Sequence, residues 1–393
     1  MDRGRLATLV VVNRGGSLLG VTDPVLVALP WWQETGPLVD TVPGTTVLRL
    51  LAVEPDERGP MGGRATYLVE AGQAFDPIAA GLRPWPGSVD QVTAAAVAAN
   101  LGPNPLRHPW ARPGGPSADL RWVQSVIPIT GQPRQHRSWN LSAIWSIPTD
   151  RGPVWLKCVP PFLAHEGTVL ELLAGDATPD LIAADGHRLL LADMPGEDGY
   201  HAYEAEQLQM IETLVKIQAA TVDRLDDFLD NGVPDLRAGP LAAELVKLVD
   251  RVAPNSRPLR ELLDELPGRF ESAAASGIPD ALVHGDPHRG NCRRGVTPAV
   301  WFDWGDSFIG NPLLDVAALH RMAGPVADRW LALWEEAVPG SNPAAGWRAL
   351  QPIAALRMAW VYQRFVDNIE PAERVYHCAD VARVVADVEA MIS

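Results

Sequence analysis

Apolar residues recur every three or four positions along the second half of the chain. This spacing brings them to one face of a helix and is typical of amphipathic helices. It predicts helices over residues 203–219, 241–252, 259–274, 315–322, 326–337, 346–368 and 371–392. Between the third and fourth helix, two short apolar runs at 282–283 and 299–302 predict strands, and each run ends in polar residues.

Strand patterns dominate the first half. Runs rich in apolar and β-branched residues, separated by glycine and proline turns, predict strands at 6–12, 15–21, 46–51, 64–70, 141–147 and 154–159. Helices are expected over residues 88–100 and 163–174. Because residues 101–116 are rich in proline and glycine, they predict a linker. The chain is thus expected to be α+β, with a small β-rich N-terminal domain at residues 1–105.

The polar loop that follows residue 283 carries the strongest chemical signal. It places Asp286 and Asn291 five positions apart. In protein kinases, a loop Asp accepts the proton of the attacking hydroxyl, and an Asn five residues later binds magnesium. Asp303 ends the next predicted strand, and its carboxylate suits the second ligand, since magnesium prefers oxygen and takes few ligands from the protein. We therefore expect Asp286 to be catalytic, and Asn291 and Asp303 to bind Mg²⁺.

A kinase-type catalytic loop requires a lysine on an upstream strand. Lys157 lies within the apolar run at 154–159. A lysine there is costly unless an anion meets it, so Lys157 is the candidate partner of the α- and β-phosphates of a nucleotide. A carboxylate of the next helix is expected to hold Lys157, and Glu166 and Glu171 both lie in that helix.

Three motif blocks occur in order: His284-Gly285-Asp286-x-His288-x-x-Asn291, Trp301-Phe302-Asp303-Trp304 and Asn311-Pro312-Leu313-Leu314-Asp315-Val316-Ala317. Together they resemble the aminoglycoside phosphotransferase family, whose members have a bilobal protein-kinase-like fold and phosphorylate small molecules. The resemblance implies a small β-rich N-lobe at 117–193 and a mainly helical C-lobe with the catalytic loop at 194–393. It implies ATP and Mg²⁺ as cofactors. His284 is expected to brace the loop, and Asp315 is expected either to start a helix or to brace the loop.

The resemblance also implies roles for residues outside these blocks. Glu166 precedes an apolar run that ends in Leu-Leu, as in the family, which favours it over Glu171, although Glu171 stays an alternative. Ser138 and Asn140 resemble the family's phosphate-covering loop, although both are also ordinary turn residues.

Two further regions are expected to contact the substrates. The apolar run at 188–192, broken by Pro195-Gly196, resembles the inter-lobe hinge, where adenine would contact the backbone around Asp193 and Met194. Acceptor contacts are expected on the late helix around Trp360, from Gln363, Arg364, Asp367 and Asn368.

Composition restricts the partners of the protein. The chain has 393 residues, of which 47% are hydrophobic, which is enough for more than one core. Its net charge of −15 argues against a nucleic-acid partner, and no apolar run is long enough to cross a bilayer. The three cysteines have no metal-ligand spacing and predict the reducing cytoplasm. The expected partner is a hydroxylated small molecule, such as a sugar, an amino sugar or an antibiotic.

The N-terminal segment has a faint likeness to a Nudix-type fold, in its first glycine turn and in the run at 66–70. Because the Nudix catalytic helix with its paired glutamates is absent, we expect a non-catalytic domain that caps or supports the kinase-like lobes. The alternative to a small-molecule kinase is a nucleotide-binding pseudokinase or regulatory module. The complete set of Lys157, Asp286, Asn291 and Asp303 argues for an enzyme that transfers the γ-phosphate of ATP to a substrate hydroxyl. A protein kinase is disfavoured, because neither His-Arg-Asp nor Asp-Phe-Gly is present.

Overall fold

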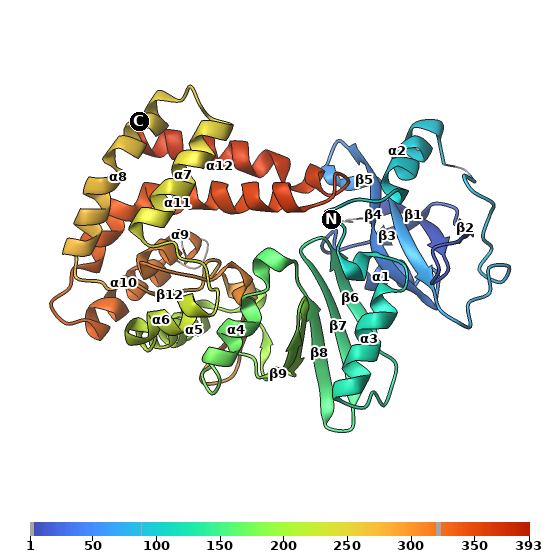
Figure 1. Ribbon diagram of the computed structural model, residues 1–393, viewed down its shortest axis with the longest axis horizontal. Coiled ribbons are helices and arrows are strands. Elements are labelled where there is room, and N and C mark those ends of the chain that lie inside the picture. The colour runs from blue at the N-terminus through green and yellow to red at the C-terminus, as the bar shows by residue number, and fades with distance from the viewer. Residues whose placement is uncertain (1–3, 88, 320–323) are drawn as a thin grey trace. The chain divides into compact units, whose positions relative to one another are not determined.

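The computed structural model describes residues 4–87, 89–319 and 324–393 (Figure 1). The chain forms two compact units. The first comprises the described residues up to Pro161, with Ile182–Leu191 and Phe365–Cys378, and the second comprises Phe162–Leu181, Ala192–Arg364 and Ala379–Ser393. Each unit therefore combines segments that are distant in the sequence. The expected division at residues 105, 117 and 193 stays a prediction.

A five-stranded mixed sheet opens the first unit. Its strands are β1 (Gly4–Val12), β2 (Leu18–Val21), β3 (Val25–Ala28), β4 (Thr45–Asp56) and β5 (Gly59–Ala71). The order is β2-β1-β5-β4, and β3 also pairs with β1. The β1–β5 pair is parallel, whereas β4 and β5 form an antiparallel hairpin. The four expected strands are present, although β2 begins at Leu18 and not at residue 15, and β3 is an additional strand.

Both faces of this sheet are buried. Along β1, Leu9 and Val11 join one hydrophobic cluster, which also contains Tyr67, while Val10 and Val12 join another. Burial on both sides explains why β1 is a continuous apolar run and does not alternate with polar residues.

Helix α2 (Gln91–Leu101) packs on the second of these clusters, against β4 (Figure 1). It begins after Asp90, whose carboxylate accepts hydrogen bonds from the backbone N–H groups of Val92 and Thr93. The N-cap is therefore Asp90. The first residue of the expected helix, Ser88, lies outside the described residues. A short helix, α1 (Gly36–Val39), precedes β4.

A second sheet completes the first unit. It contains β6 (Arg134–Trp139), β7 (Ser142–Thr149), β8 (Gly152–Cys158), β10 (Arg188–Ala192) and β9 (Leu181–Asp185), in that order. Helix α3 (Gly115–Val126) buries Val123 in a cluster with Trp145 and Leu156 of this sheet. The sequence did not predict α3, because its start, around Gly114 and Pro116, is rich in glycine and proline and therefore resembles a linker. Proline is favoured in the first turn of a helix, and Pro116 lies in the first turn of α3.

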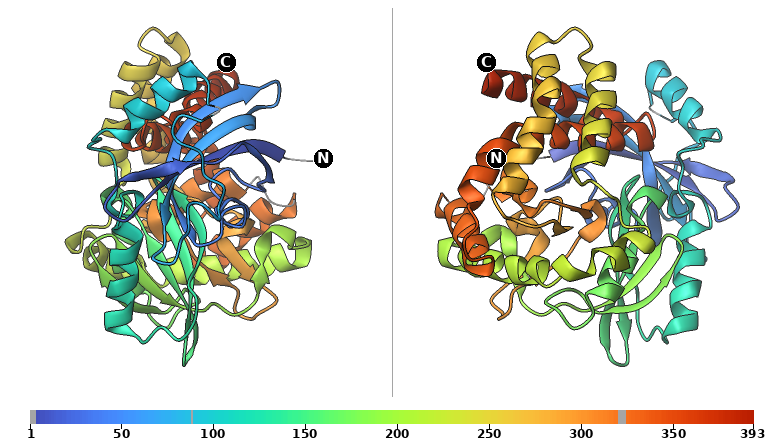
Figure 2. Two further views of the ribbon diagram at one scale, coloured as in Figure 1. Left: turned by 90° about the vertical axis from the view of Figure 1, so that its right-hand side faces the viewer. Right: turned by 60° about the vertical axis from the view of Figure 1, so that its left-hand side comes forward.

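The second unit is mainly helical. Its helices are α4 (Glu166–Leu172), α5 (Glu204–Ala219), α6 (Leu225–Asp230), α7 (Ala238–Val252), α8 (Arg257–Ala275), α9 (Val316–Leu319), α10 (Pro325–Ala337), most of α11 (Pro343–Asn368) and nearly all of α12 (Cys378–Ile392). Helices α7 and α8 lie side by side (Figure 2). The expected helix at 371–392 begins only at residue 378, after a 3-10 turn at Arg374–Tyr376. The end of the expected helix at 315–322 lies outside the described residues.

Short strands frame the polar loops of the second unit. They are β11 (Glu197–Asp198), β12 (Ala281–Val283), β13 (Cys292–Arg294), β14 (Val300–Trp301) and β15 (Phe308–Gly310). They form a three-stranded sheet, β11-β13-β14, and the pair β12-β15.

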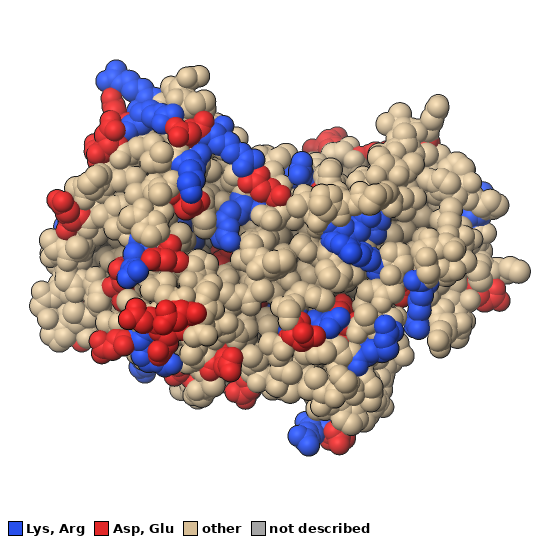
Figure 3. All heavy atoms as spheres, in the orientation of Figure 1, with Lys and Arg blue, Asp and Glu red and all other residues tan. Residues whose placement is uncertain are grey.

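Charges of both signs intermix on the face of α7 and α8 that Figure 3 shows. Arg257 pairs with Glu261, and Arg260 pairs with Asp250. The net negative charge is therefore not gathered into one patch over these helices. None of the described helices combines the length and the apolar character that crossing a bilayer requires.

Candidate functional site

The loop between β12 and β13 is held close to the segment that follows β14. Gly285 has a φ of 89°, and a Cβ at this position would lie 2.0 Å from the backbone oxygen of Asp306. Only glycine combines this conformation with such a close approach. The loop that carries Asp286 therefore packs against the segment that contains Asp306.

Asp315 braces the backbone of this loop. Its carboxylate accepts hydrogen bonds from the N–H groups of His284, at 3.1 Å, and Gly285, at 2.9 Å, and from the side-chain amide of Gln218, at 2.8 Å. Burial is the largest influence on Asp315 and raises its pKa to about 6, while Arg357 and the three donors act in the opposite direction. The bracing contacts that the sequence led us to expect of Asp315 are present.

His284 links the loop to the end of β14. Its side chain is fully buried, and its Nε2 lies 3.1 Å from the backbone oxygen of Phe302. The imidazole also packs against the rings of Trp301 and Trp304, with centroids 5.4 and 4.5 Å away. This contact fixes the residue that directly precedes Asp303.

Asn291 and Asp303 lie on neighbouring backbone segments. The backbone N–H of Phe302 donates to the backbone oxygen of Asn291 at 3.0 Å, and the side-chain nitrogen of Asn291 donates to the backbone oxygen of Asp286 at 3.0 Å. The side-chain oxygen of Asn291 is therefore its atom suited to a metal ion. Asp303 is exposed and has the left-handed backbone conformation, with φ 65° and ψ 58°, which is uncommon outside glycine.

Three carboxylates come together at this point. The pKa of Asp306 is raised to about 7, first by burial and then by the charges of Asp286 and Asp303. Neighbouring negative charges disfavour one another's ionisation, so a divalent cation would stabilise the group. Asp303 and Asn291 offer the hard oxygen ligands that Mg²⁺ prefers. The donor set of this chain therefore fits the expected metal.

His288 contacts the expected catalytic residue, Asp286, and the sequence motif alone does not predict this contact. Its Nε2 lies 3.5 Å from Oδ2 of Asp286. Its Nδ1 accepts a hydrogen bond from the backbone N–H of Gly290 at 3.0 Å, so in the neutral ring the proton is on Nε2, next to Asp286. His288 belongs to the same motif as Asp286, but its proximity to Asp286 depends on how the loop folds.

Lys157 and Glu166 belong to different units. Lys157 lies in β8 and is 9% exposed, and Glu166 begins α4 and is 1% exposed. Glu171 of the same helix is exposed, so burial favours Glu166 as the inward-facing carboxylate. The Lys157–Glu166 pair, and the approach of Lys157 to a nucleotide bound at Asp303, stay predictions.

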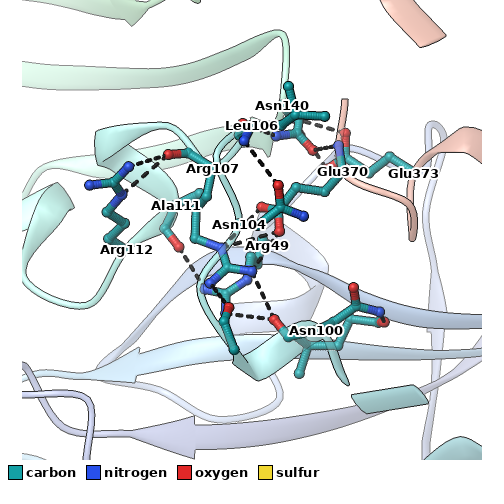
Figure 4. A network of polar contacts seen from close by, with 12 residues as sticks. Arg49, Asn100, Asn104, Leu106, Arg107, Ala111, Arg112, Asn140, Glu370 and Glu373 are labelled. Carbon is teal, nitrogen blue, oxygen red and sulfur yellow. Dashed lines mark hydrogen bonds and ion pairs between the residues drawn. The ribbon is translucent and has the colours of Figure 1, made fainter. Parts of the chain in front are cut away.

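Ser138 and Asn140 are buried and engaged in the first unit. The hydroxyl of Ser138 donates to the backbone oxygen of Leu48 at 3.0 Å. Asn140 donates its backbone N–H to the carboxylate of Glu373 at 2.9 Å, and its side-chain oxygen accepts from the backbone N–H of Glu370 at 3.0 Å (Figure 4). These contacts point to a structural role. They give no support to the expected contacts with nucleotide phosphates, which stay a prediction.

The expected hinge lies at a crossing between the units. The chain passes from the first unit to the second between Leu191 and Ala192, directly before Asp193 and Met194. Asp193 is exposed and Met194 is half-buried. Their contacts with adenine stay a prediction.

Arg364, one of the expected acceptor contacts, is held by aromatic side chains. Its guanidinium lies 4.5 Å from the ring centroid of Trp360 and 5.0 Å from that of Phe162. It also donates to the backbone oxygen of Phe162 at 3.3 Å. Trp360 in turn donates its indole N–H to Glu244 at 3.1 Å. Arg364 and Trp360 are thus held in place, and the contacts of Gln363, Arg364, Asp367 and Asn368 with an acceptor stay predictions.

A second cluster of metal-ligand residue types lies in the first unit. Ligand atoms of Asp119, Cys158 and His187 all lie within 4.8 Å of one another. Arg188 donates its Nε to Asp119 at 2.7 Å, so this carboxylate already has a cationic partner. Burial, and then the charge of Asp119, raises the pKa of the Cys158 thiol, which disfavours the thiolate that metals bind. We interpret the cluster as structural.

Several solved structures resemble the chain at low sequence identity. They include a macrolide 2′-phosphotransferase from Brachybacterium faecium, with 14% identity and a TM-score of 0.49 over 70% of this chain and 97% of that one. The GDP complex of aminoglycoside 2′-phosphotransferase-IIIa has 16% identity and a TM-score of 0.49 over 69% and 98%. A choline/ethanolamine kinase family protein from Mesorhizobium loti has 15% identity and a TM-score of 0.48 over 69% and 94%. Among curated proteins, none matches the chain.

The family comparison covers the candidate site. Residues 156–353, about half of the chain, match the model of the phosphotransferase enzyme family, and they include Lys157, Asp286, Asn291 and Asp303. The expected fold class is confirmed: an α+β protein with a kinase-like fold, preceded by a β-rich segment. None of these comparisons supports the Nudix likeness of that segment. The chain belongs to the phosphotransferase enzyme family.

Proposed function

We propose that this protein is an ATP-dependent small-molecule kinase, which transfers the γ-phosphate of the nucleotide to a hydroxyl group of its substrate. The observation that carries the proposal is the loop of the second unit. There Asp286, Asn291 and Asp303 stand on backbone segments that hydrogen bonds join to one another. Membership of the phosphotransferase enzyme family supports the same reaction class.

Each residue of the site has its own role in the transfer. Asp286 orients the acceptor hydroxyl and takes its proton, and His288 holds the carboxylate of Asp286 in place. Asn291 and Asp303 would hold Mg²⁺, which would supply positive charge to offset that of the phosphates. Lys157, steadied by Glu166, pairs with the nucleotide phosphates. Catalysis of this kind depends mainly on positioning and electrostatics.

The nucleotide and the acceptor would use further parts of the chain. We propose that adenine contacts the backbone around Asp193 and Met194, where the chain crosses between units. The acceptor is a small hydroxylated molecule.

The experiment that tests the proposal compares Asp286→Asn with the wild type. ADP release is measured with Mg²⁺ and a panel of sugars, amino sugars, amino alcohols and antibiotics, and nucleotide binding is measured by calorimetry. We expect nucleotide binding to stay nearly intact and transfer to fall about a thousandfold or more, which corresponds to roughly 4 kcal/mol of transition-state stabilisation.

The matched control is Asp264→Asn, because Asp264 is an exposed acid on α8. We expect this variant to retain wild-type transfer. Near-wild-type transfer by Asp286→Asn would exclude Asp286 as the base. A wild type that binds the nucleotide but releases no ADP with any acceptor would favour the alternative function, a nucleotide-binding pseudokinase or regulatory module.

A further inference from the structure

Arg357 of α11 reaches the catalytic loop from a distant part of the chain. Its side chain is only 1% exposed. Its Nη2 donates a hydrogen bond to the backbone oxygen of Gly285 at 2.5 Å. The guanidinium also lies 4.7 Å from the ring centroid of Phe308 in β15, in cation–π geometry. A buried arginine is therefore held by an aromatic ring and aimed at one carbonyl of the loop.

The carbonyl that Arg357 contacts belongs to the peptide unit that joins Gly285 to Asp286. A peptide unit is planar, so its oxygen and the Cα of the next residue move together. Holding the oxygen of Gly285 therefore fixes the rotation of the plane on which the Cα of Asp286 lies. Gly285 itself has the wide conformational freedom of glycine, and Arg357 adds a contact on its carbonyl side to the contact that Asp315 makes with its N–H.

Asp315 and Arg357 hold opposite sides of the same turn. The carboxylate of Asp315 accepts the N–H groups of His284 and Gly285, whereas Arg357 donates to the carbonyl that follows. The charge of Arg357 also acts on Asp315 and Asp306, and the charge of Asp286 acts on Arg357. The buried guanidinium thus gives a positive centre to a loop that is surrounded by carboxylates.

We propose that Arg357 is a positioning residue for phosphoryl transfer, which holds the carbonyl of Gly285 and so orients the peptide plane from which Asp286 projects. This inference rests on the proposed function of Asp286. It assigns Arg357 no contact with the nucleotide or with the acceptor. Loss of the side chain should therefore affect the rate of the chemical step more than the binding of either substrate.

The test compares Arg357→Met and Arg357→Lys with Arg348→Met, an exposed arginine of the same helix. The side chain of methionine keeps much of the apolar volume and removes the donor. For Arg357→Met we expect kcat to fall about 10- to 100-fold, since small displacements of a catalytic group cost this much. The KM for the nucleotide should stay within about twofold. Lysine keeps the charge but lacks the planar donor fork, so Arg357→Lys should recover part of the rate.

Hydrogen–deuterium exchange gives a second measurement that does not depend on activity. We expect faster exchange in Arg357→Met in peptides that cover residues 284–291, no change in the rest of the second unit, and wild-type exchange in Arg348→Met. If Arg357→Met does not fold, Arg357→Lys carries both measurements against the same control.

Three outcomes would overturn the proposal. They are an unchanged kcat, a rise in nucleotide KM that accounts for the loss of kcat/KM, and faster exchange throughout the second unit, which would indicate general destabilisation. Failure of the proposed function is recognised separately, since the wild type would then transfer no phosphate to any acceptor. In that case the exchange data decide alone: a loop unchanged in Arg357→Met refutes the positioning contact, and a loop that exchanges faster supports it.

Discussion

Burial changes the chemistry of single acids in this protein, and Glu373 is a clear case. Its carboxylate lies inside the first unit and accepts the backbone N–H of Asn140 at 2.9 Å. Burial raises its pKa from 4.5 to about 8, the N–H of Asn140 acts in the opposite direction, and the charge of Glu370 raises the pKa further. At neutral pH, Glu373 therefore carries a proton in the folded protein.

This protonation predicts how Glu373→Gln changes stability with pH. Between pH 4.5 and 8 the folded state holds a proton that the unfolded state has lost, so the wild type loses stability as the pH rises through this window. Glutamine does not titrate. The stability of the variant relative to the wild type should therefore increase as the pH rises to about 8, and then stay constant. The total change should be on the order of a few kcal/mol in the free energy of unfolding, and it appears as a rising difference in Tm.

Differential scanning calorimetry from about pH 5 to 9 measures this difference. The exposed Glu57→Gln is the control, and we expect its difference from the wild type to be independent of pH over this range. A difference for Glu373→Gln that stays constant from about pH 5 to 9 would show that Glu373 is already ionised in the folded state over this range.

Among the secondary-structure elements, α3 is attached to the second sheet of the first unit by one buried carboxylate. Asp119 of α3 lies 2.7 Å from Nε of Arg188 and 3.2 Å from Nε2 of His187, at the hairpin between β9 and β10. Arg188 also lies 5.8 Å from the ring centroid of Trp122, on the same helix. The helix is thus fixed by charge as well as by its apolar face.

Removal of this carboxylate should loosen α3. We expect Asp119→Ala to lower the free energy of unfolding by about 3 kcal/mol, because it leaves the cation of Arg188 without its buried partner. Urea denaturation measures the loss. Asp185→Ala is a matched control, since Asp185 pairs with the same arginine at 3.0 Å but is exposed. An exposed pair contributes about 1 kcal/mol or less. Equal losses in the two variants would contradict the role of Asp119 as a buried anchor.

Across the whole molecule, the tail segment Phe365–Cys378 is part of the first unit, although the segments on either side of it belong to the second. Arg107 holds this segment through Glu370, 263 positions away, with an N–O distance of 2.6 Å (Figure 4). Arg49 lies close to the pair: Arg107 lowers its pKa and Glu370 raises it, after a larger lowering by burial. The negative charge of Glu370 therefore offsets the positive charges of two buried arginines.

A double-mutant cycle tests this tie between distant segments. We expect Arg107→Met and Glu370→Met each to cost about 3 to 5 kcal/mol in the free energy of unfolding, and the double variant to cost less than the sum. Glu370→Met should be the more costly change, since it leaves Arg49 and Arg107 to repel each other. The exposed pair Arg83 and Asp23, at 2.6 Å, is the control and should show a coupling of about 1 kcal/mol or less. A coupling for the buried pair no larger than that of the control would refute the tie.

Local patterns were sufficient for most of the secondary structure and for the polar loop. The helical repeats from residue 203 onward correspond to helices, although the last helix begins seven residues late, at residue 378. Asp286 and Asn291 lie within one loop, and Asp303 follows the next strand, so their relation depends on short stretches of backbone. Helix α3 was not predicted, because its first turn contains glycine and proline, which are also common in linkers.

The sequence by itself determined most of the alternation of strands and helices and the membership of the phosphotransferase enzyme family, and it predicted Asp286, Asn291 and Asp303 as site residues, because periodicity and motif spacing act over a few residues. Only the tertiary structure decided which distant side chains meet. In the folded protein, Asn140 forms hydrogen bonds with Glu370 and Glu373, more than two hundred positions away. Arg357 forms a hydrogen bond with the carbonyl oxygen of Gly285. Such contacts depend on how whole segments pack and on which polar groups burial leaves to be satisfied, and no local pattern records that.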